Sequence, residues 1–407
     1  MKKKVLIITT AFPRWKNDTY PSFVYELAKT LSKKEFIVKV LSPHYLKAKF
    51  LEKENNLTTK RFLYFYPLKY QKLAYNMLPN IKDNKLLIFE IPSFFLSYIL
   101  NSIRILKKEK IKVINSHWII PSGFIGAILK KLYGIKHICT IHAGGITILN
   151  KLPFKRLIAN FIVKNTDYFT IVSSHGKELL LNLTSPNLRK DTEKKIRIVS
   201  MGIYSNKYKY VENKKKLREK NNIKSKYVLL FVGRLTEKKG VKYLLEAMPQ
   251  IIKEFKDVEL LIVGDGVLKK ELMKLTKDLK IEKNVKFLGY IVGNKKNEYL
   301  SLSDLFISSS IVTQYGDTEG LPVVIMEAIA SGLPVVATNV GGTRDIVVNN
   351  KNGFLINQRN SKEIVNSVYK MLNDPELTKR FSNNSLKMSK KYGWEVIAKE
   401  YSKIILN

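Results

Sequence analysis

Residues 319–337 read EGLPVVIMEAIASGLPVVA and place two glutamates, Glu319 and Glu327, eight positions apart. Pro322 cannot donate a backbone hydrogen bond and suits a first helical turn, while Gly332 suits the end of a helix. We therefore expect Glu319 in a loop and Glu327 about one and a half turns into the helix that follows. Because the free N–H groups of a helix N-terminus favour anions, the stretch predicts a ligand with hydroxyls for the carboxylates and phosphates for the amides.

The neighbours of Glu327 decide between two interpretations of this carboxylate. A single glutamate is most often a solvated surface residue, and Glu319 and Glu327 could both be so. Residues 323–330 are however apolar on almost every helical face, which is typical of a buried helix. This pattern favours a carboxylate that faces a cleft or a partner.

Length and composition indicate a globular protein of more than one domain. With 407 residues, 45% of them hydrophobic, the chain exceeds one ordinary core, and two domains are expected. The single cysteine, Cys139, cannot form an internal disulfide and is interpreted as a small core residue. A reducing, cytoplasmic setting is the default for such a chain.

The chain shows no clear targeting or spanning segment. The lysines at residues 2–4 precede an apolar run too short for a signal peptide, so we expect a first buried strand there. The longest apolar stretch, Ile91–Leu100, spans about ten residues, whereas a transmembrane helix needs about 20.

The charge is strongly positive, with 72 Lys and Arg against 34 Asp and Glu. Attraction to an anionic membrane, a genomic bias toward lysine, and nucleic-acid binding could each explain it. No helix-turn-helix, zinc-finger or RNP-type motif supports nucleic acid. Segments 60–72 and 152–164 mix basic with aromatic or apolar residues and are candidates for contact with lipid headgroups, or alternatively for packing on their own domain.

Apolar strand-like runs alternate with helical stretches along the whole chain, the rhythm of parallel sheets covered by helices. The expected strands are Val5–Thr9, Val38–Ser42, Val113–Ser116, Ile138–His142, Tyr168–Val172 and Ile196–Ser200 in the first half, and Val228–Val232, Glu259–Val263, Val285–Leu288, Leu305–Ser308, Pro334–Ala337 and Gly353–Ile356 in the second. The charged stretch Val211–Lys226 separates the halves. We expect an α/β protein of two Rossmann-like domains, with the ligand in a cleft between them.

Residues 233–240 read GRLTEKKG between an expected strand and a helix that begins near Val241. A strand, a loop with a glycine at each end and a helix form the shape of a phosphate site. Arg234 can grip phosphate oxygens with a planar fork, and Lys239 adds a point charge. The Gly-Lys-Ser/Thr of a Walker loop is absent, which argues against an ATPase. The alternative is a pair of solvated loop cations.

Further motifs follow in order: VGDG at 263–266, FLG at 287–289, GG at 341–342 and NGFL at 352–355. Taken together, the region from Gly233 to Leu355 resembles the C-terminal domain of the retaining glycosyltransferases of the GT-B fold, the group 4 family of the glycosyl transferases group 1 type. The resemblance implies an N-terminal acceptor-binding domain at 1–205, a nucleotide-sugar-binding domain at 206–385, and a C-terminal helix at 386–407 that crosses back to the first domain.

The resemblance also implies roles for individual residues. Arg234 and Lys239 match the pair that binds the donor diphosphate, Glu327 the glutamate at the nucleotide ribose, and Glu319 the glutamate at the donor sugar hydroxyls. Backbone atoms would hold the rest of the donor, those of Gly320, Leu321 and Val323 at the sugar or diphosphate and those of Tyr290 and Ile291 at the base.

In the first half the resemblance is weaker. Thr140-Ile141-His142 resembles the strand end whose histidine lies near the anomeric centre, so His142 joins Glu319 as a candidate catalytic residue. The aspartate that often follows in the family is missing after His142. His117 matches a recurrent histidine that is expected to be structural. The glycine-rich loop usual after the first strand is replaced by residues 19–23, TYPSF.

The resemblance implies a retaining transfer of a hexose-type sugar from a nucleotide-diphosphate donor to a hydroxyl acceptor. No Asp-x-Asp or His/Cys cluster suggests a metal, and no cofactor is expected. The basic, aromatic first half favours a lipid-linked glycan or glycolipid acceptor of cell-surface polysaccharide synthesis, and a cytoplasmic enzyme peripheral on the inner face of the membrane.

Two other classes stay open. A GT-B nucleotide-sugar 2-epimerase would need more carboxylates in the cleft than the motifs supply. A basic nucleic-acid-binding protein would bind with steep salt dependence, and neither Glu319→Ala nor Glu327→Ala would affect it.

Overall fold

The computed structural model describes all residues except 1, 17, 19–21 and 76. It also does not describe the side chains of Leu78 and Ala143. The chain forms two compact units: unit 1 is Met1–Gly202 with Trp394–Asn407, and unit 2 is Ile203–Gly393. Residues 386–393, expected with the terminal helix, group with unit 2. Helix α15 (Pro375–Ser389) packs there against α13 (Val323–Ala330), and Ser385 Oγ donates to the carbonyl of Leu333 at 2.9 Å.

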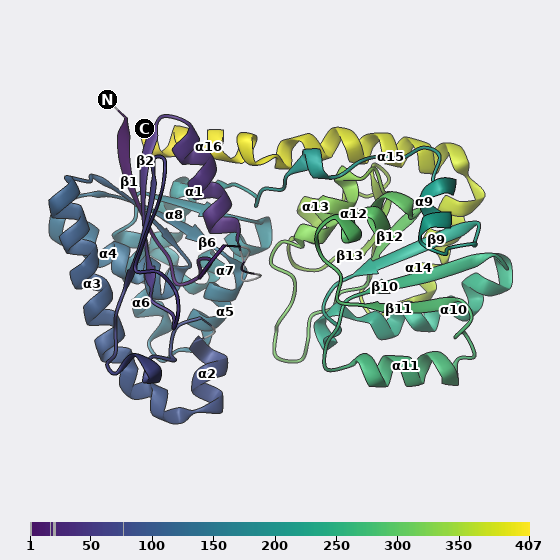
Figure 1. Cartoon of the computed structure of the whole chain (residues 1–407), viewed down its shortest axis with the longest axis horizontal. Helices are drawn as coiled ribbons and strands as arrows, with labels where there is room; N and C mark the ends of the chain where they lie inside the picture. Colours follow the sequence, from purple (N-terminus) through teal and green to yellow (C-terminus); the bar gives the residue numbers. More distant parts are fainter. Residues whose placement is uncertain (1, 17, 19–21, 76) are drawn as a thin grey trace. The chain divides into compact units, whose positions relative to one another are not determined.

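Unit 1 contains an eight-stranded sheet in the order β3-β4-β2-β1-β5-β6-β7-β8, of which Figure 1 labels β1, β2 and β6. Its neighbouring strands are parallel except β3 and β4. The strands are β1 Lys3–Ile8, β2 Phe36–Pro43, β3 Leu51–Glu54, β4 Leu57–Phe62, β5 Val113–His117, β6 Lys136–Ile141, β7 Tyr168–Ile171 and β8 Ile196–Ile198. Cys139 on β6 is fully buried, as the sequence predicts.

The antiparallel edge of this sheet was not predicted. Strand β3 reads LEKE and is mostly exposed, so it has no apolar run to reveal it. Strand β4 reads LTTKRF and turns Leu57, Thr59 and Phe62 into the core. Part of segment 60–72 therefore belongs to a sheet, which agrees for these residues with the alternative of packing on their own domain.

Helices cover the sheet of unit 1, and the C-terminal helix is one of them. They are α1 Phe23–Lys33, α2 Met77–Asp83, α3 Glu90–Glu109, α4 Phe124–Tyr133, α5 Ala143–Lys151, α6 Lys155–Lys164, α7 Ser174–Leu183, α8 Pro186–Lys195 and α16 Trp394–Leu406, with the short turns η1 Leu68–Tyr70, η2 Lys85–Phe89 and η3 Ile119–Gly123. Helix α16 lies beside α1 in Figure 1, and Tyr401 OH meets Thr140 Oγ1 on β6 at 3.2 Å. The terminal helix thus completes unit 1.

One helical stretch, Lys85–Glu109, is long and apolar enough to cross a membrane by length and composition, with a mean hydropathy of 1.6 and 28% of its window buried. No such segment was expected, because the longest apolar stretch in the sequence, Ile91–Leu100, is only about ten residues long and contains a proline and two serines. In the structure α3 packs on β1, β2 and β4, and Phe94 and Tyr98 join the core. Helix α3 is therefore a helix of unit 1 whose outer face is apolar.

Unit 2 contains a six-stranded parallel sheet in the order β11-β10-β9-β12-β13-β14. Its strands are β9 Tyr227–Val232, β10 Val258–Val263, β11 Val285–Gly289, β12 Leu305–Ser308, β13 Val335–Thr338 and β14 Gly353–Ile356. Its helices are α9 Lys215–Lys220, α10 Val241–Glu254, α11 Lys269–Asp278, α12 Gly293–Leu302, α13, α14 Ser361–Asn373 and α15, with the turns η4 Ser205–Lys207, η5 Glu237–Lys239, η6 Gly341–Asp345 and η7 Lys390–Tyr392.

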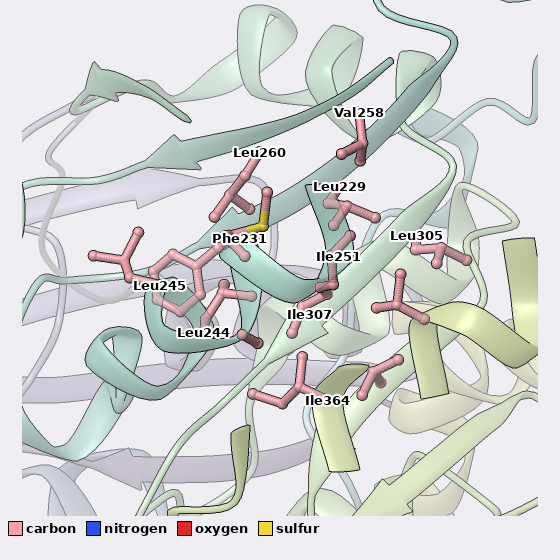
Figure 2. Close-up of a cluster of buried hydrophobic side chains, with 14 of the residues drawn as sticks. Leu229, Phe231, Leu244, Leu245, Ile251, Val258, Leu260, Leu305, Ile307 and Ile364 are labelled. Carbon is pink, nitrogen blue, oxygen red and sulfur yellow. The ribbon is translucent and has the colours of Figure 1, made fainter. Parts of the chain in front are cut away.

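A hydrophobic core packs helices onto the sheet of unit 2 (Figure 2). The loops that follow the strands therefore start from a well-packed framework. Alternate residues such as Leu229 and Phe231 of β9 point to one face, because side chains alternate along a strand. They meet Leu244 and Leu245 of α10 and Ile364 of α14. Each fully buried side chain of this size stabilises the fold by about 1.5–3 kcal/mol.

Candidate functional site

Three loops of unit 2 meet at the carboxyl edge of its sheet. Strands β9, β12 and β13 are parallel neighbours, so the loops that follow them leave from the same edge. The loop after β9 carries Lys239, the loop after β12 carries Glu319, and the turn after β13 carries Gly341. Ligands of open parallel sheets bind at such edges.

The first two loops are joined by backbone contacts. The N–H of Ile311 donates to the carbonyl of Lys238 at 2.8 Å, and Ser309 Oγ donates to the carbonyl of Lys239 at 3.1 Å. Gly240 has a φ of +58°, and a Cβ there would lie 2.0 Å from the carbonyl oxygen of Ser309. Only glycine fits this approach.

Lys239 and Glu319 form an ion pair at that junction, with 3.0 Å between Nζ and Oε1. Both side chains are largely buried, and Ser310 Oγ donates to the same Oε1 at 3.4 Å. The structure therefore brings together the cation of the first motif and the first glutamate of the second, as expected.

The glycines of the third loop hold the backbone of Glu319. The N–H of Gly342 donates to the carbonyl of Glu319 at 3.3 Å. Gly341 has a φ of +54°, and a Cβ there would come within 1.8 Å of the same carbonyl oxygen. The predicted glycine pair thus positions Glu319 from the neighbouring strand.

Glu327 is the fifth residue of α13 and is buried, as its apolar neighbours predict. Lys296 of α12 donates to both of its carboxylate oxygens at 2.7 Å, and Tyr208 OH donates to Oε1 at 2.7 Å. Burial and, second, this carboxylate raise the pKa of Tyr208, so its hydroxyl stays a donor. Helix α13 ends before Gly332, whose φ of +77° suits a helix terminus.

The remaining predicted donor residues differ in exposure. Arg234 is exposed, and no ion pair or side-chain hydrogen bond of its guanidinium is found within the part of the chain that the structure describes. Tyr290 is 68% exposed at the end of β11, and Ile291 beside it is partly buried. Backbone positions Gly320, Leu321 and Val323 lie between the two glutamates, and no side chain caps α13.

His142 belongs to unit 1, where it follows β6 and precedes α5. It is buried, and its Nε2 lies 3.2 Å from Nδ1 of His117. Its ring centroid is 4.7 Å from those of Phe23 and Trp118. Burial lowers the pKa of His142 to about 3, so the side chain is a neutral hydrogen-bonding group and not a general acid. Residues 19–21 of the segment that replaces the glycine-rich loop after the first strand lie outside the described residues.

His117 was expected to be structural, and the structure places it in direct contact with the candidate catalytic histidine. Its Nε2 lies 3.0 Å from Asn115 Oδ1 on β5. Burial and, second, the charge of His142 lower the pKa of His117 well below its ordinary value.

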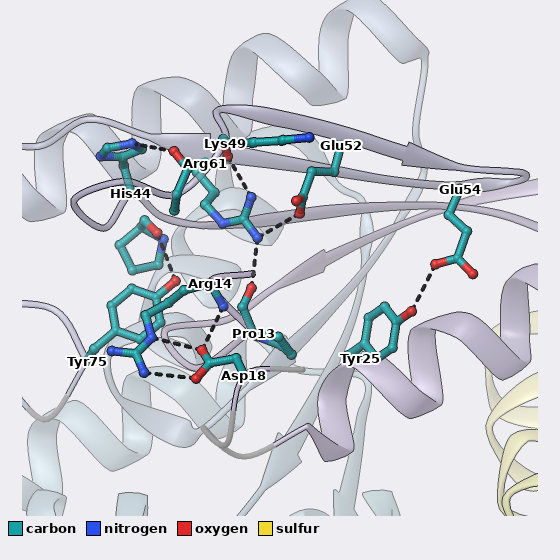
Figure 3. Close-up of polar contacts among 12 residues, drawn as sticks. Pro13, Arg14, Asp18, Tyr25, His44, Lys49, Glu52, Glu54, Arg61 and Tyr75 are labelled. Carbon is teal, nitrogen blue, oxygen red and sulfur yellow. Dashed lines mark hydrogen bonds and ion pairs between the residues drawn. The ribbon is translucent and has the colours of Figure 1, made fainter. Parts of the chain in front are cut away.

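Unit 1 also contains a pocket of about 560 Å³ near the carboxyl ends of β2 and β4. Arg14 lies there over the ring of Tyr45, with 4.7 Å from its guanidinium carbon to the centroid, and Tyr75 and Lys69 line the same pocket. Figure 3 shows how Asp18 holds the guanidinium of Arg14, at 2.8 Å to Nε and 2.9 Å to the terminal nitrogen. The pocket offers aromatic faces with cations beside them.

The same close-up shows what supports this pocket (Figure 3). Arg61 on β4 is buried and donates to the carbonyl of Pro13 at 2.7 Å, to that of Lys49 at 2.6 Å and to Glu52 at 2.9 Å. Its guanidinium thus ties the loop after β1 to the β3–β4 edge.

Family comparisons agree with this arrangement. A model of the glycosyl transferases group 1 family matches residues 213–388, and a model of glycosyltransferase family 4 matches residues 22–204. The chain belongs to the group 1 glycosyltransferases. This glycosyltransferase has the GT-B fold: it superposes on the Anabaena protein HepE, solved with UDP, with a TM-score of 0.72 and 18% identity over 99% of both chains.

Curated relatives of the glycosyltransferase are similar over much of their length. An uncharacterized glycosyltransferase of Methanocaldococcus jannaschii is 27% identical over 88% of this chain and 95% of its own. The Escherichia coli UDP-Gal:alpha-D-GlcNAc-diphosphoundecaprenol alpha-1,3-galactosyltransferase is 28% identical over 74% of this chain and 75% of its own.

Sequence reasoning missed several residues of the glycosyltransferase that touch the predicted ones. Lys296, Tyr208, Ser310 and Asn115 come from other elements and stand in no motif. A buried carboxylate needs a partner, so a cation near Glu327 could have been expected but not located. The pocket beside Arg14 gave no signal, because its lining is spread from residue 14 to residue 87.

Proposed function

We propose that the glycosyltransferase moves a hexose-type sugar from a nucleoside-diphosphate donor to a hydroxyl acceptor with retention of configuration. The observation that carries the proposal is the buried ion pair of Lys239 and Glu319, held by three loops at the strand ends beside the N-terminus of α13. Such an edge offers cations and amides to phosphates and carboxylates to hydroxyls.

Charge stabilisation is the main role proposed for unit 2. When the bond between sugar C1 and the diphosphate breaks, negative charge grows on the leaving oxygens. Arg234, Lys239 and the uncapped amides of α13 would stabilise this charge without a metal, since preorganised donors cost no reorganisation. The exposed guanidinium of Arg234 suits a group that acquires its partner when the donor binds.

The carboxylates and the histidine would position the donor. Glu327 would take the ribose hydroxyls, and Glu319 and His142 would position and polarise the sugar. The acceptor oxygen attacks C1 from the face that the diphosphate leaves, and the departing phosphate takes the acceptor's proton. No covalent enzyme intermediate is needed in this scheme.

The comparisons support a nucleotide-sugar donor and a lipid-linked acceptor. The name of the E. coli relative includes UDP-Gal and a diphosphoundecaprenol-linked sugar, and HepE was solved with UDP. For the acceptor we propose a lipid-linked glycan or glycolipid whose sugar enters the pocket beside Arg14 and Tyr45, since aromatic faces pack well on sugar rings. Tyr45→Ala would then raise KM for the acceptor and leave KM for the donor unchanged.

The donor role is tested by Arg234→Ala. We expect kcat/KM for sugar transfer to fall roughly 30- to 1,000-fold. This corresponds to a loss of about 2–4 kcal/mol of transition-state stabilisation, as for other preorganised oxyanion donors. Lys242→Ala is the control, because this exposed lysine is the second residue of α10 and has no role in the proposed donor site. Equal kcat/KM for Arg234→Ala and the parent would remove the assignment.

A membrane surface fits the outer face of the helix 85–109. Phe89, Leu96 and Leu100 are exposed at spacings of seven and four residues, and Arg104 and Lys108 continue the same side of the helix. The acids of this stretch are turned away from it: Glu90 is buried, and Glu109 pairs with Lys4 and Lys39. We propose that this face, with the exposed Phe154 and Leu157 of segment 152–164, rests on the anionic inner leaflet of the cytoplasmic membrane.

Flotation with anionic liposomes tests this face. The parent protein should float at low salt and float less at high salt, because part of the attraction is electrostatic. The double variant Leu96→Ser/Leu100→Ser should float less, whereas Val267→Ser, an exposed apolar residue of unit 2, should not change flotation. An absence of flotation at low salt would refute the membrane proposal and leave the donor proposal standing.

A further inference from the structure

The orientation of one buried amide in unit 1 is determined by its neighbours. Asn115 Nδ2 lies 2.9 Å from Thr140 Oγ1 and 3.3 Å from the carbonyl oxygen of Ile138. A flipped amide would set its own carbonyl oxygen against that of Ile138, two acceptors face to face. The nitrogen therefore faces β6, and Oδ1 faces His117 at 3.0 Å.

This orientation fixes the proton positions in both histidines. Oδ1 of Asn115 only accepts, so Nε2 of His117 must carry the hydrogen. A neutral imidazole has one N–H, so Nδ1 of His117 is an acceptor and receives the N–H of His142 Nε2 over 3.2 Å. Both rings are neutral because burial holds their pKa values low. Nδ1 of His142 is then left with a lone pair.

That lone pair has no partner within the described part of the chain. His142 Nδ1 is buried and makes no hydrogen bond with any residue that the structure describes. The ring is held between Phe23 and Trp118 and stacks on His117 with 18° between the planes. A buried acceptor without a donor is unfavourable, which is typical of a site completed by a ligand.

We infer that Asn115 and His117 are positioning residues that keep the proton of His142 on Nε2 and present its Nδ1 as the acceptor for a sugar hydroxyl. The inference rests on the proposed function, because it names what the sugar-positioning histidine accepts. It also excludes the opposite use of His142 as an N–H donor to a carbonyl or phosphate oxygen.

The tautomers can be read directly by NMR on the full chain labelled with ¹⁵N-histidine, with His142→Gln to assign the signal. We expect His142 to be protonated on Nε2. Asn115→Leu removes the acceptor and should move His142 toward protonation on Nδ1. Protonation on Nδ1 in the parent, or a spectrum unchanged by Asn115→Leu, would overturn the relay. The parent measurement decides even if Asn115→Leu does not fold.

The ligand role needs a second readout. Addition of UDP-glucose, or of another nucleotide sugar that the protein transfers, should shift the Nδ1 resonance of His142; a resonance that stays in place under saturating donor would overturn the hydroxyl contact. Asn115→Leu should lower kcat/KM about tenfold, which corresponds to the free energy of about one hydrogen bond. The tautomers are observed without turnover, so a lack of transfer activity would count against the proposed function alone.

Discussion

At the scale of single residues, each site glutamate of unit 2 has its own lysine: Glu319 pairs with Lys239 and Glu327 with Lys296. Without these lysines, two negatively charged carboxylates would be buried near the N-terminus of α13 with no cation to balance them. The pairs keep the charges balanced, which makes the burial of both carboxylates possible.

Removal of one partner of the Glu327–Lys296 pair should be costly. We expect Glu327→Gln and Lys296→Met each to lower the free energy of unfolding by about 3 kcal/mol, because one charge is left buried. The double variant should lose clearly less than the sum of the two, as residues in contact are coupled. Urea-induced unfolding measures all three.

The exposed pair Lys242–Glu246, with side chains 59% and 33% exposed, provides the control for this cycle. Its single variants should change the unfolding free energy by less than about 1 kcal/mol. Strict additivity at Glu327 and Lys296 would contradict the coupling.

Buried histidines make the stability of unit 1 depend on pH. Burial lowers the pKa of His137 to about 4 and that of His142 to about 3, below the ordinary value near 6.5. Their contribution to stability is complete above pH 6.5 and declines as the pH falls, because the unfolded chain binds protons first.

We therefore expect the free energy of unfolding to fall between pH 7 and pH 5 by about 2 kcal/mol for each of these two histidines. In His142→Gln the fall should be smaller by that amount. Urea titrations at the two pH values test this, and equal stability at both would show that the rings are not held neutral by burial.

At the scale of elements, strands with an apolar run were predictable even at the sheet edges, as β8, β11 and β14 show, whereas the antiparallel edge β3–β4 and the full length of α3 were not. Strands such as β9, which reads YVLLFV, are continuous apolar runs and stand out in the sequence. Strand β3 is polar and exposed, and helix α3 mixes serines and a proline with its apolar residues. Their places depend on the partner strand and on the core beneath, which no local pattern encodes.

The candidate site divides in the same way. Lys239, Glu319 and Glu327 stand in motifs whose spacing follows from a loop and a helix, so they could be selected in advance. Lys296 reaches Glu327 because α12 packs beside α13, and Asn115 reaches His117 and Thr140 because β5 pairs with β6 in this register. Such partners follow from tertiary structure and not from spacing.

The turn η6 offers a test of how neighbouring loops hold Glu319. Gly341→Ala should lower kcat/KM for sugar transfer and lower the unfolding free energy by about 2–4 kcal/mol, since it combines a left-handed φ with a Cβ forced onto Glu319's carbonyl oxygen. Gly316→Ala is the matched control: its φ is +74°, but nothing lies within 4 Å of the added Cβ.

Gly316→Ala should therefore lose only about 1–2 kcal/mol of stability, from the backbone conformation alone. Unfolding curves and steady-state kinetics compare the two variants. A similar loss in both would mean that the contact between Gly341 and Glu319 has no effect of its own.

At the scale of the whole molecule, unit 1 is built from two distant pieces of chain and unit 2 from one. Residues 203–393 contain a complete sheet and core, so we expect this fragment, expressed alone, to unfold cooperatively in urea. A chain ending at residue 393 lacks α16 and the contact of Tyr401 with Thr140, and we expect its N-terminal portion to lose protection from proteolysis. Equal protease resistance of the truncated and full chains would contradict this.

The position of α16 has a consequence for biosynthesis. A ribosome releases residues 1–202 long before it makes Trp394–Leu406, so the earlier half of the polypeptide waits incomplete while the later half can already fold. Unit 2 can therefore fold before unit 1 is complete, although unit 1 begins earlier in the chain. Until the codons of α16 are read, the apolar surface that this helix will cover is open to chaperones.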